Sequence, residues 1–110
     1  IDLDVHQGNG TAAIFENDPD VYTFSVHGER NYPSDKMRST RDVGLPDGTT
    51  GAECLQALQL HLPAVLAARE RQMPLAITLA GGYAATPLRT AELHAIVFEE
   101  AARMERTTTQ

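Results

Sequence analysis

The first ten residues constrain the fold of this chain more than any other segment. Asp2, Asp4 and His6 alternate with apolar residues. Successive side chains of a strand point to opposite faces, so this spacing predicts a strand over residues 1–5 with three metal-capable groups on one side. Asp is depleted in strands, and its recurrence favours a metal site over an acidic edge strand. The glycine turn at residues 8–10 lets backbone approach that site closely.

Length and charge narrow the class of protein. With 110 residues, the chain allows one small domain, residues 1–110. Its net charge of −6 argues against general nucleic-acid binding, and no apolar run is long enough to cross a bilayer. We therefore expect neither nucleic acid nor membrane among its partners. One cysteine, Cys54, excludes an internal disulfide and favours a reducing compartment such as the cytoplasm. Its helical context favours a small buried apolar role over a catalytic thiol.

Strand-like and helix-like segments alternate along the chain. Residues 28–50 are expected to form a long polar loop, a length that often indicates a functional loop. Pro63 is expected to kink a helix or to begin a new one. This alternation predicts an α/β fold whose parallel sheet carries helices on both faces. We expect strands at 1–5, 21–26 and 75–80, and helices at 11–17, 51–72 and 87–106.

Ligand sites in parallel sheets form outside the carboxyl ends of strands, where several polar residues fall here. Asp4 and His6 offer an oxygen and a nitrogen, a common pair for zinc, and a catalytic zinc needs a third protein ligand. Asp2 could be that ligand, or it could hold a hard cation such as potassium or calcium together with Ser25.

Tyr83 follows the glycines at the end of the third expected strand. Its hydroxyl could donate a hydrogen bond to a developing oxyanion, although a tyrosine packed on a tight turn is the commoner outcome. His27 could line the same mouth, and a structural hydrogen-bonding role is our default interpretation. His61 and His94 lie in helical patterns, which favours surface or packing roles.

Four segments resemble a known family. Residues 1–11 (IDLDVHQGNGT) resemble the metal motif of the zinc-dependent histone deacetylases, in the arginase–deacetylase superfamily. Residues 21–33 (VYTFSVHGERNYP) resemble the next strand and loop of bacterial members near the class IV type. Residues 44–49 (GLPDGT) and 79–84 (LAGGYA) resemble the following loop and the segment that carries the catalytic tyrosine.

The resemblance implies a fold of the arginase–deacetylase type and hydrolysis of acetyl-lysine or of a small acetylated amine. It implies that Asp4 and His6 bind zinc and that Tyr83 polarises the substrate carbonyl. A first potassium site is implied at Asp2, Asp4, His6, Ser25 and Val26, with His6 and Val26 acting through carbonyl oxygens. A second potassium site is implied at the backbone carbonyls of Phe15, Asp18 and Val21.

Two parts of the family pattern are missing from the sequence. The paired histidines that act as general base and acid precede the metal motif in the family, and the third zinc ligand is an aspartate between the matched halves. No aspartate follows Asp47. We therefore expect a chain truncated before the motif and deleted internally near residues 67–70.

Three hypotheses for function follow. The chain is an amidohydrolase by descent, or a non-catalytic remnant that retains metal binding, or an arginase-like manganese hydrolase. The third is least favoured, because it needs further aspartates beyond Asp47. Loss of a strand would remove ladder hydrogen bonds and core area, so we also expect marginal stability or dependence on self-association into a homo-oligomer.

Overall fold

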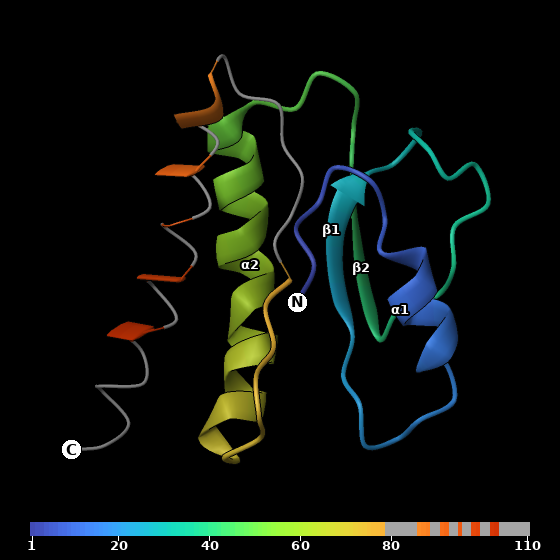
Figure 1. Ribbon diagram of the computed structural model, residues 1–110, viewed down its shortest axis with the longest axis vertical. Helices are drawn as coiled ribbons and strands as arrows, with labels where there is room; N and C mark the ends of the chain where they lie inside the picture. Colours follow the sequence, from blue (N-terminus) through green and yellow to red (C-terminus); the bar gives the residue numbers. More distant parts are fainter. Residues whose placement is uncertain (79–85, 89–90, 93–94, 96–97, 100–101, 104–110) are drawn as a thin grey trace.

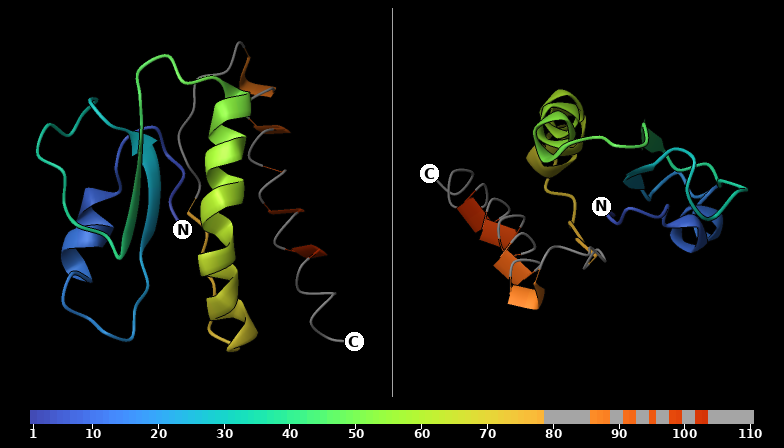
Figure 2. Two further views of the ribbon diagram at one scale, coloured as in Figure 1. Left: turned by 180° about the vertical axis from the view of Figure 1, so that it is seen from behind. Right: turned by 90° about the horizontal axis from the view of Figure 1, so that it is seen from above.

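The computed structural model describes residues 1–78, 86–88, 91–92, 95, 98–99 and 102–103. Helix α1 is followed by two parallel strands, β1 and β2, and by the long helix α2. The two strands lie between α1 and α2 in both side views (Figures 1 and 2). The expected α/β class, a parallel sheet with helices, is confirmed. The bounds are α1 Asn9–Ile14, β1 Phe24–Gly28, β2 Arg41–Leu45 and α2 Gly51–Glu70.

The sheet extends beyond β1 through the first residues of the chain. Asp2 forms a parallel bridge with Ser25 of β1. On its other side, the Ile1 amine donates to the carbonyl of Ala76 (2.9 Å), and the Thr78 amide donates to the carbonyl of Ile1 (3.1 Å). This pair of bonds is the pattern of parallel neighbours. The order across the sheet is therefore residues 76–78, residues 1–2, β1 and β2.

The predicted strand over residues 1–5 is wrong beyond its first two residues. The Asp4 amide donates to Oδ1 of Asp2 (3.0 Å), and the His6 amide donates to Oδ1 of Asp4 (2.7 Å). These carboxylates take the amides that a ladder would otherwise use, which is how Asp disfavours regular strands. Only the bridge at Asp2 remains of the predicted ladder.

Other strand predictions need correction as well. The expected loop at residues 28–50 contains β2, which pairs with β1 in a register that places Ser25 opposite Asp42. β1 itself begins three residues later than the strand predicted at 21–26. Residues 75–78 are not assigned as a strand, although they bond to Ile1 as described, and residues 79–80 lie outside the described part.

The helices agree better with the sequence. α2 confirms the predicted helix and continues through Pro63 without a break, so the alternative that a new helix begins at Pro63 is wrong. Thr50 and Glu53 cap its first turn reciprocally: the Thr50 amide donates to Oε2 of Glu53 (2.7 Å), and the Glu53 amide donates to Oγ1 of Thr50 (3.4 Å). α1 begins two residues before the predicted helix and ends three residues before its end.

The core lies between the sheet and α2. Phe24 and Val26 point to this side of β1 and pack with Val43 of β2 and Val65 of α2. The opposite face of β1 is also buried but polar, since Ser25 and His27 are 3% and 5% exposed. The sheet is therefore covered on both faces, as expected, by apolar packing on one side only.

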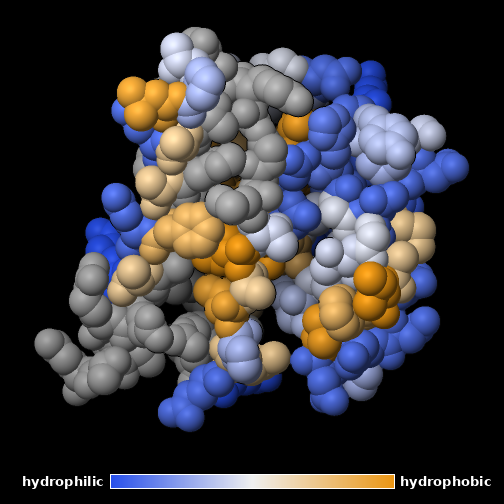
Figure 3. Space-filling view, viewed as in Figure 1, coloured by the Kyte–Doolittle hydropathy of each residue, from blue (hydrophilic) through white to orange (hydrophobic). Residues whose placement is uncertain are grey.

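Much apolar surface remains outside this core. Leu55 and Leu60 of α2 are 60% and 75% exposed, and Leu88 and Phe98 of the helix predicted at 87–106 are exposed as well. Figure 3 shows hydrophobic surface over α1 and along the segment after α2, where Ile14 and Leu75 are exposed. Within the described residues, no helix is both long and apolar enough to span a bilayer.

Cys54 lies half-buried in α2 and forms no disulfide. Burial raises the pKa of its thiol, which keeps the thiol protonated at neutral pH and unreactive as a nucleophile. This agrees with the structural role expected for Cys54, although the side chain is less buried than predicted.

Candidate metal centre

The predicted zinc ligands face each other. Oδ1 of Asp4 and Nδ1 of His6 lie 3.1 Å apart, and their side chains are 24% and 48% exposed. Two donors on one tetrahedral zinc, each about 2.1 Å from the ion, lie about 3.4 Å apart. The pair therefore fits a half-site for zinc that opens to solvent. Its arrangement comes from the backbone, because the same Asp4 oxygen accepts the His6 amide.

Asp2, Ser25 and Val26 meet where the first segment bridges β1. The Asp2 amide donates to the Phe24 carbonyl (2.8 Å), and the Val26 amide donates to the Asp2 carbonyl (3.0 Å). Oγ of Ser25 lies 2.9 Å from Nδ1 of His27. Asp2, Ser25 and Val26 of the first predicted potassium site are thus adjacent in the fold, and the Asp2 carboxylate is linked to the Asp4 amide.

His27 has the structural role that was our default. It is buried against Ser25, and burial lowers the pKa of its imidazole, while the charges of Asp42 and Asp2 raise that pKa and the charge of Lys36 lowers it further. A neutral His27 ring can accept the Ser25 hydroxyl proton through Nδ1, leaving the serine lone pairs free. His61 also has a packing role, since its Nδ1 lies 2.9 Å from Nη1 of Arg41.

Gln7, Asp42 and Tyr32 are parts of this region that the sequence interpretation missed. The Gln7 amide is 4% exposed and reaches β2 at Asp42, with Oδ1 of Asp42 at 3.0 Å from Nε2. Tyr32, 78% exposed, places its ring edge-on to the ring of His6 with centroids 6.4 Å apart. The position of Gln7 directly after His6, a metal-capable residue, was the sequence signal that could have identified it.

Other predicted site residues are not brought to this centre. Tyr83 and His94 lie outside the described residues. Phe15, Asp18 and Val21 form a turn in which the Asp18 amide donates to the Phe15 carbonyl (3.2 Å) and the Val21 amide donates to the Asp18 carbonyl (3.4 Å). Within the described part of the chain, no three His, Cys, Asp or Glu side chains converge closely enough to hold a metal ion.

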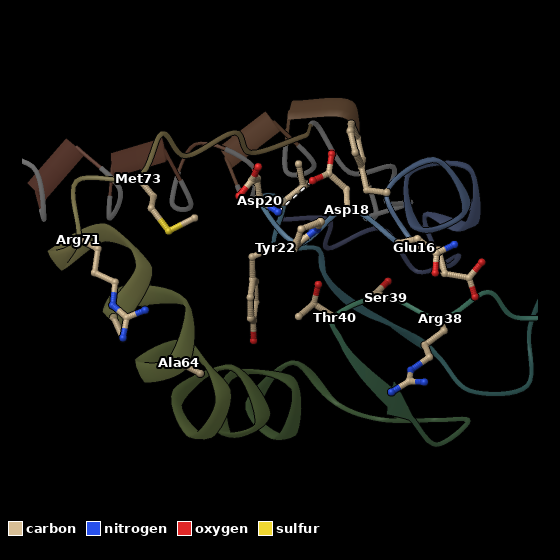
Figure 4. Close-up of a pocket in the computed structure, with 15 residues that line it drawn as sticks. Glu16, Asp18, Asp20, Tyr22, Arg38, Ser39, Thr40, Ala64, Arg71 and Met73 are labelled. Carbon is tan, nitrogen blue, oxygen red and sulfur yellow. Dashed lines mark hydrogen bonds between the residues drawn. The ribbon is translucent and has the colours of Figure 1, made fainter.

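The turn at residues 15–21 borders a separate hollow of about 920 Å³. Figure 4 shows Tyr22 pointing into it, with Arg38 and Arg71 on opposite sides and Asp18 and Asp20 along another wall. Asp4 and His6 are not among its lining residues. The mixed charge of its walls gives no preference for an anion or a cation.

A family model described as a histone deacetylase domain matches residues 1–104. The chain belongs to the histone deacetylase family. The chain is 56% identical over 66 residues to an uncharacterized protein of Picosynechococcus. The match covers 60% of the chain and 22% of that protein. The chain is 35% identical over 95 residues to histone deacetylase 10, chloroplastic, of Oryza sativa, covering 80% and 21% respectively.

A histone deacetylase-like amidohydrolase of Pseudomonas aeruginosa is 34% identical over 122 residues, which cover 96% of the chain and 31% of that protein. Because those 122 aligned positions exceed the chain's 110 residues, the Pseudomonas protein has residues within the aligned region that this chain lacks. This agrees with the expected internal deletion without locating it. The chain spans between a fifth and a third of the length of these three relatives.

Proposed function

We propose that residues 1–110 are part of one deacetylase domain and supply two zinc ligands to an amidohydrolase. The proposed substrate is an acetylated lysine or a small acetylated amine. The observation that carries the proposal is the facing pair Asp4 Oδ1 and His6 Nδ1 at 3.1 Å, on a segment that matches a histone deacetylase model. Its solvent exposure would leave room for a substrate carbonyl.

Bound zinc supplies Lewis-acid chemistry, which polarises an amide carbonyl and lowers the pKa of water. In this proposal Asp4 contributes an anionic oxygen and His6 a neutral nitrogen. Asp2 fixes the backbone of Asp4 by accepting its amide. Tyr83 would donate a hydrogen bond to the oxyanion of the tetrahedral intermediate.

Potassium is proposed as a second cation beside the zinc ligands. The carboxylates of Asp2 and Asp4, the hydroxyl of Ser25 and the carbonyl oxygens of His6 and Val26 are hard oxygen donors, which such cations prefer. The Ser25–His27 contact of 2.9 Å supports this role, because a serine that donates to His27 keeps its lone pairs for a cation. The turn carbonyls of Phe15, Asp18 and Val21 are proposed for a second potassium ion.

A non-catalytic relative that retains metal binding is the second candidate. The observation that favours it is that no third metal-capable side chain joins Asp4 and His6 within the described residues. A catalytic zinc normally has three protein ligands, so two alone would bind the ion more weakly. The chain contains a free thiol, Cys54. For either candidate function we therefore propose a reducing compartment such as the cytoplasm.

The test measures zinc content by mass spectrometry and turnover of an acetyl-lysine reporter in the same preparations. Asp4→Ala and His6→Ala remove the two ligands, and Asp47→Ala removes an acidic side chain from a loop that borders a different hollow. Zinc and turnover lost only in the first two variants would support the deacetylase. Zinc without turnover, still dependent on Asp4 and His6, would support the non-catalytic relative. Zinc content insensitive to both substitutions would reject both candidates.

A further inference from the structure

Gln7 joins the segment that carries Asp4 and His6 to a loop far along the chain. Its buried side-chain amide makes a reciprocal pair of bonds with the backbone of Met37. Nε2 donates to the Met37 carbonyl (2.6 Å), and Oε1 accepts the Met37 amide (2.7 Å). The Gln7 side chain therefore satisfies backbone groups that a neighbouring strand would otherwise pair.

The same amide also reaches β2. Nε2 of Gln7 donates to Oδ1 of Asp42 (3.0 Å), whose other oxygen accepts the Ser39 amide (2.8 Å). Asp42 lies opposite Ser25 in the sheet, and Ser25 is the residue that bridges to Asp2. The segment is thus attached to the sheet through its backbone at Asp2 and at Val5, whose carbonyl accepts from the Gly28 amide of β1, and through a side chain at Gln7.

Between Asp2 and Gln7, the bond at Val5 is the one backbone link to the sheet among the described residues. The Asp4 and His6 amides bond to carboxylates of the segment itself, and the Val5 carbonyl accepts from the Gly28 amide (2.8 Å) and from Nδ2 of Asn31. Because Gln7 directly follows His6, fixing the Gln7 side chain restricts the backbone of His6 and hence the direction of its ring.

We propose that Gln7 is a positioning residue, which holds His6 against Asp4 in a geometry ready for metal through its bonds to Met37 and Asp42. The effect of Gln7 on metal affinity rests on the proposed metal site. The effect of Gln7 on the position of His6 can be tested in the metal-free chain. Outer partners of metal ligands orient those ligands, and their loss typically weakens metal binding by about 10- to 100-fold.

Three variants of the 110-residue chain test the proposal. Gln7→Met removes all three bonds at similar size. Gln7→Glu places a carboxylate against Asp42, and adding Asp42→Asn turns that contact back into a donor–acceptor pair. Thr23→Val is the matched control: it removes a buried hydroxyl that accepts the Thr40 amide (2.8 Å) and does not touch Gln7.

Two readouts separate positioning from general stability. Hydrogen exchange of the His6 amide, followed by NMR in the metal-free chain, reports its bond to Asp4. Titration with Co²⁺, followed by its visible absorption, reports metal affinity and ligand geometry. Exchange rates are compared at equal distance from each variant's unfolding midpoint, so that global unfolding contributes equally to every rate.

Gln7→Met is expected to speed exchange of the His6 amide by at least about tenfold and to weaken Co²⁺ binding by about 10- to 100-fold. Thr23→Val is expected to change neither. Asp42→Asn should restore part of the affinity that Gln7→Glu loses. Unchanged exchange in Gln7→Met, or equal losses in Thr23→Val, would overturn the role of Gln7. If the unsubstituted chain binds no Co²⁺, the metal function fails, and the exchange rates alone decide the role of Gln7.

Discussion

The carboxylate of Asp2 occupies the space in which any residue other than glycine at position 8 would carry its β-carbon. A β-carbon built on Gly8 would lie 2.3 Å from Oδ2 of Asp2 and 3.1 Å from its Cγ. Oδ1 of the same carboxylate accepts the Asp4 amide at 3.0 Å, so the group cannot move away without losing that bond. The close approach of Gly8 to Asp2 therefore depends on the same carboxylate that fixes the backbone of Asp4.

Gly8→Ala is accordingly expected to lower the free energy of unfolding by about 1–3 kcal/mol through overpacking. Gly10→Ala is the control, because a β-carbon there meets nothing within 4 Å and lies inside α1. It should raise the free energy of unfolding by about 0.5–1 kcal/mol. Urea unfolding of both variants provides the measurement, and a Gly8→Ala midpoint equal to that of the unsubstituted chain would contradict the expectation.

The capping pair at the start of α2 should give a defined pH dependence. The backbone amide of Thr50, followed by its hydroxyl, lowers the pKa of the Glu53 carboxyl. A lowered folded-state pKa means that the stabilisation is present above the unfolded value, about 4.3, and is lost as pH falls through the folded value. The difference in urea midpoint between the unsubstituted chain and Glu53→Gln should therefore shrink below pH 4. A difference that stays constant from pH 6 to pH 3 would count against the cap.

Replacement of Gln72 is expected to increase the stability of the chain. It follows the end of α2 with a φ of 59°, in the left-handed region that costs a residue with a β-carbon about 1–2 kcal/mol. Helices commonly end on such a residue, and glycine is preferred there. Gln72→Gly is expected to stabilise the chain by about 1 kcal/mol, measured as a rise in the thermal midpoint. A fall in that midpoint would show that Gln72 makes contacts worth more than the relief.

The small core leads us to expect either marginal stability of the monomer or self-association. Only Phe24, Val26, Val43 and Val65 form the buried cluster among the described residues, while Leu55 and Leu60 are exposed. We expect the monomer to unfold with less than about 5 kcal/mol, the lower end of the usual range, or to gain stability by association. Sedimentation and urea unfolding at two protein concentrations distinguish these cases. A sharp, concentration-independent transition of a monomer at high urea would refute both.

Elements formed by local interactions were predictable from the sequence, whereas elements that depend on distant contacts were not. α2 was predictable, because the helical spacing of its apolar residues is a local signal, and the helix continues through Pro63. β2 was not, since Arg41–Leu45 carries few strand-forming residues and is defined by its pairing with β1. The facing of Asp4 and His6 was expected, but their spacing arises from side-chain bonds to amides rather than from a strand.

The role of Gln7 in the candidate site was likewise not predictable from local sequence. Its partners Met37 and Asp42 lie 30 and 35 residues away in sequence, so no local pattern connects them. Tyr83 could be matched to a family segment, but its placement lies outside the described residues. The metal-capable residues were thus predictable by type, whereas their supporting contacts depend on the folded loop.

The contact between Ile1 and the segment after α2 also bears on the order of folding events. Ile1 pairs with Ala76 and Thr78, more than 70 residues away, so these bonds close a loop that contains nearly the whole described chain. Closing so long a loop costs entropy that only late contacts recover. Helix α2, built from local bonds, is therefore expected to form early, and docking of the first residues between their two neighbours to be the final, rate-limiting step.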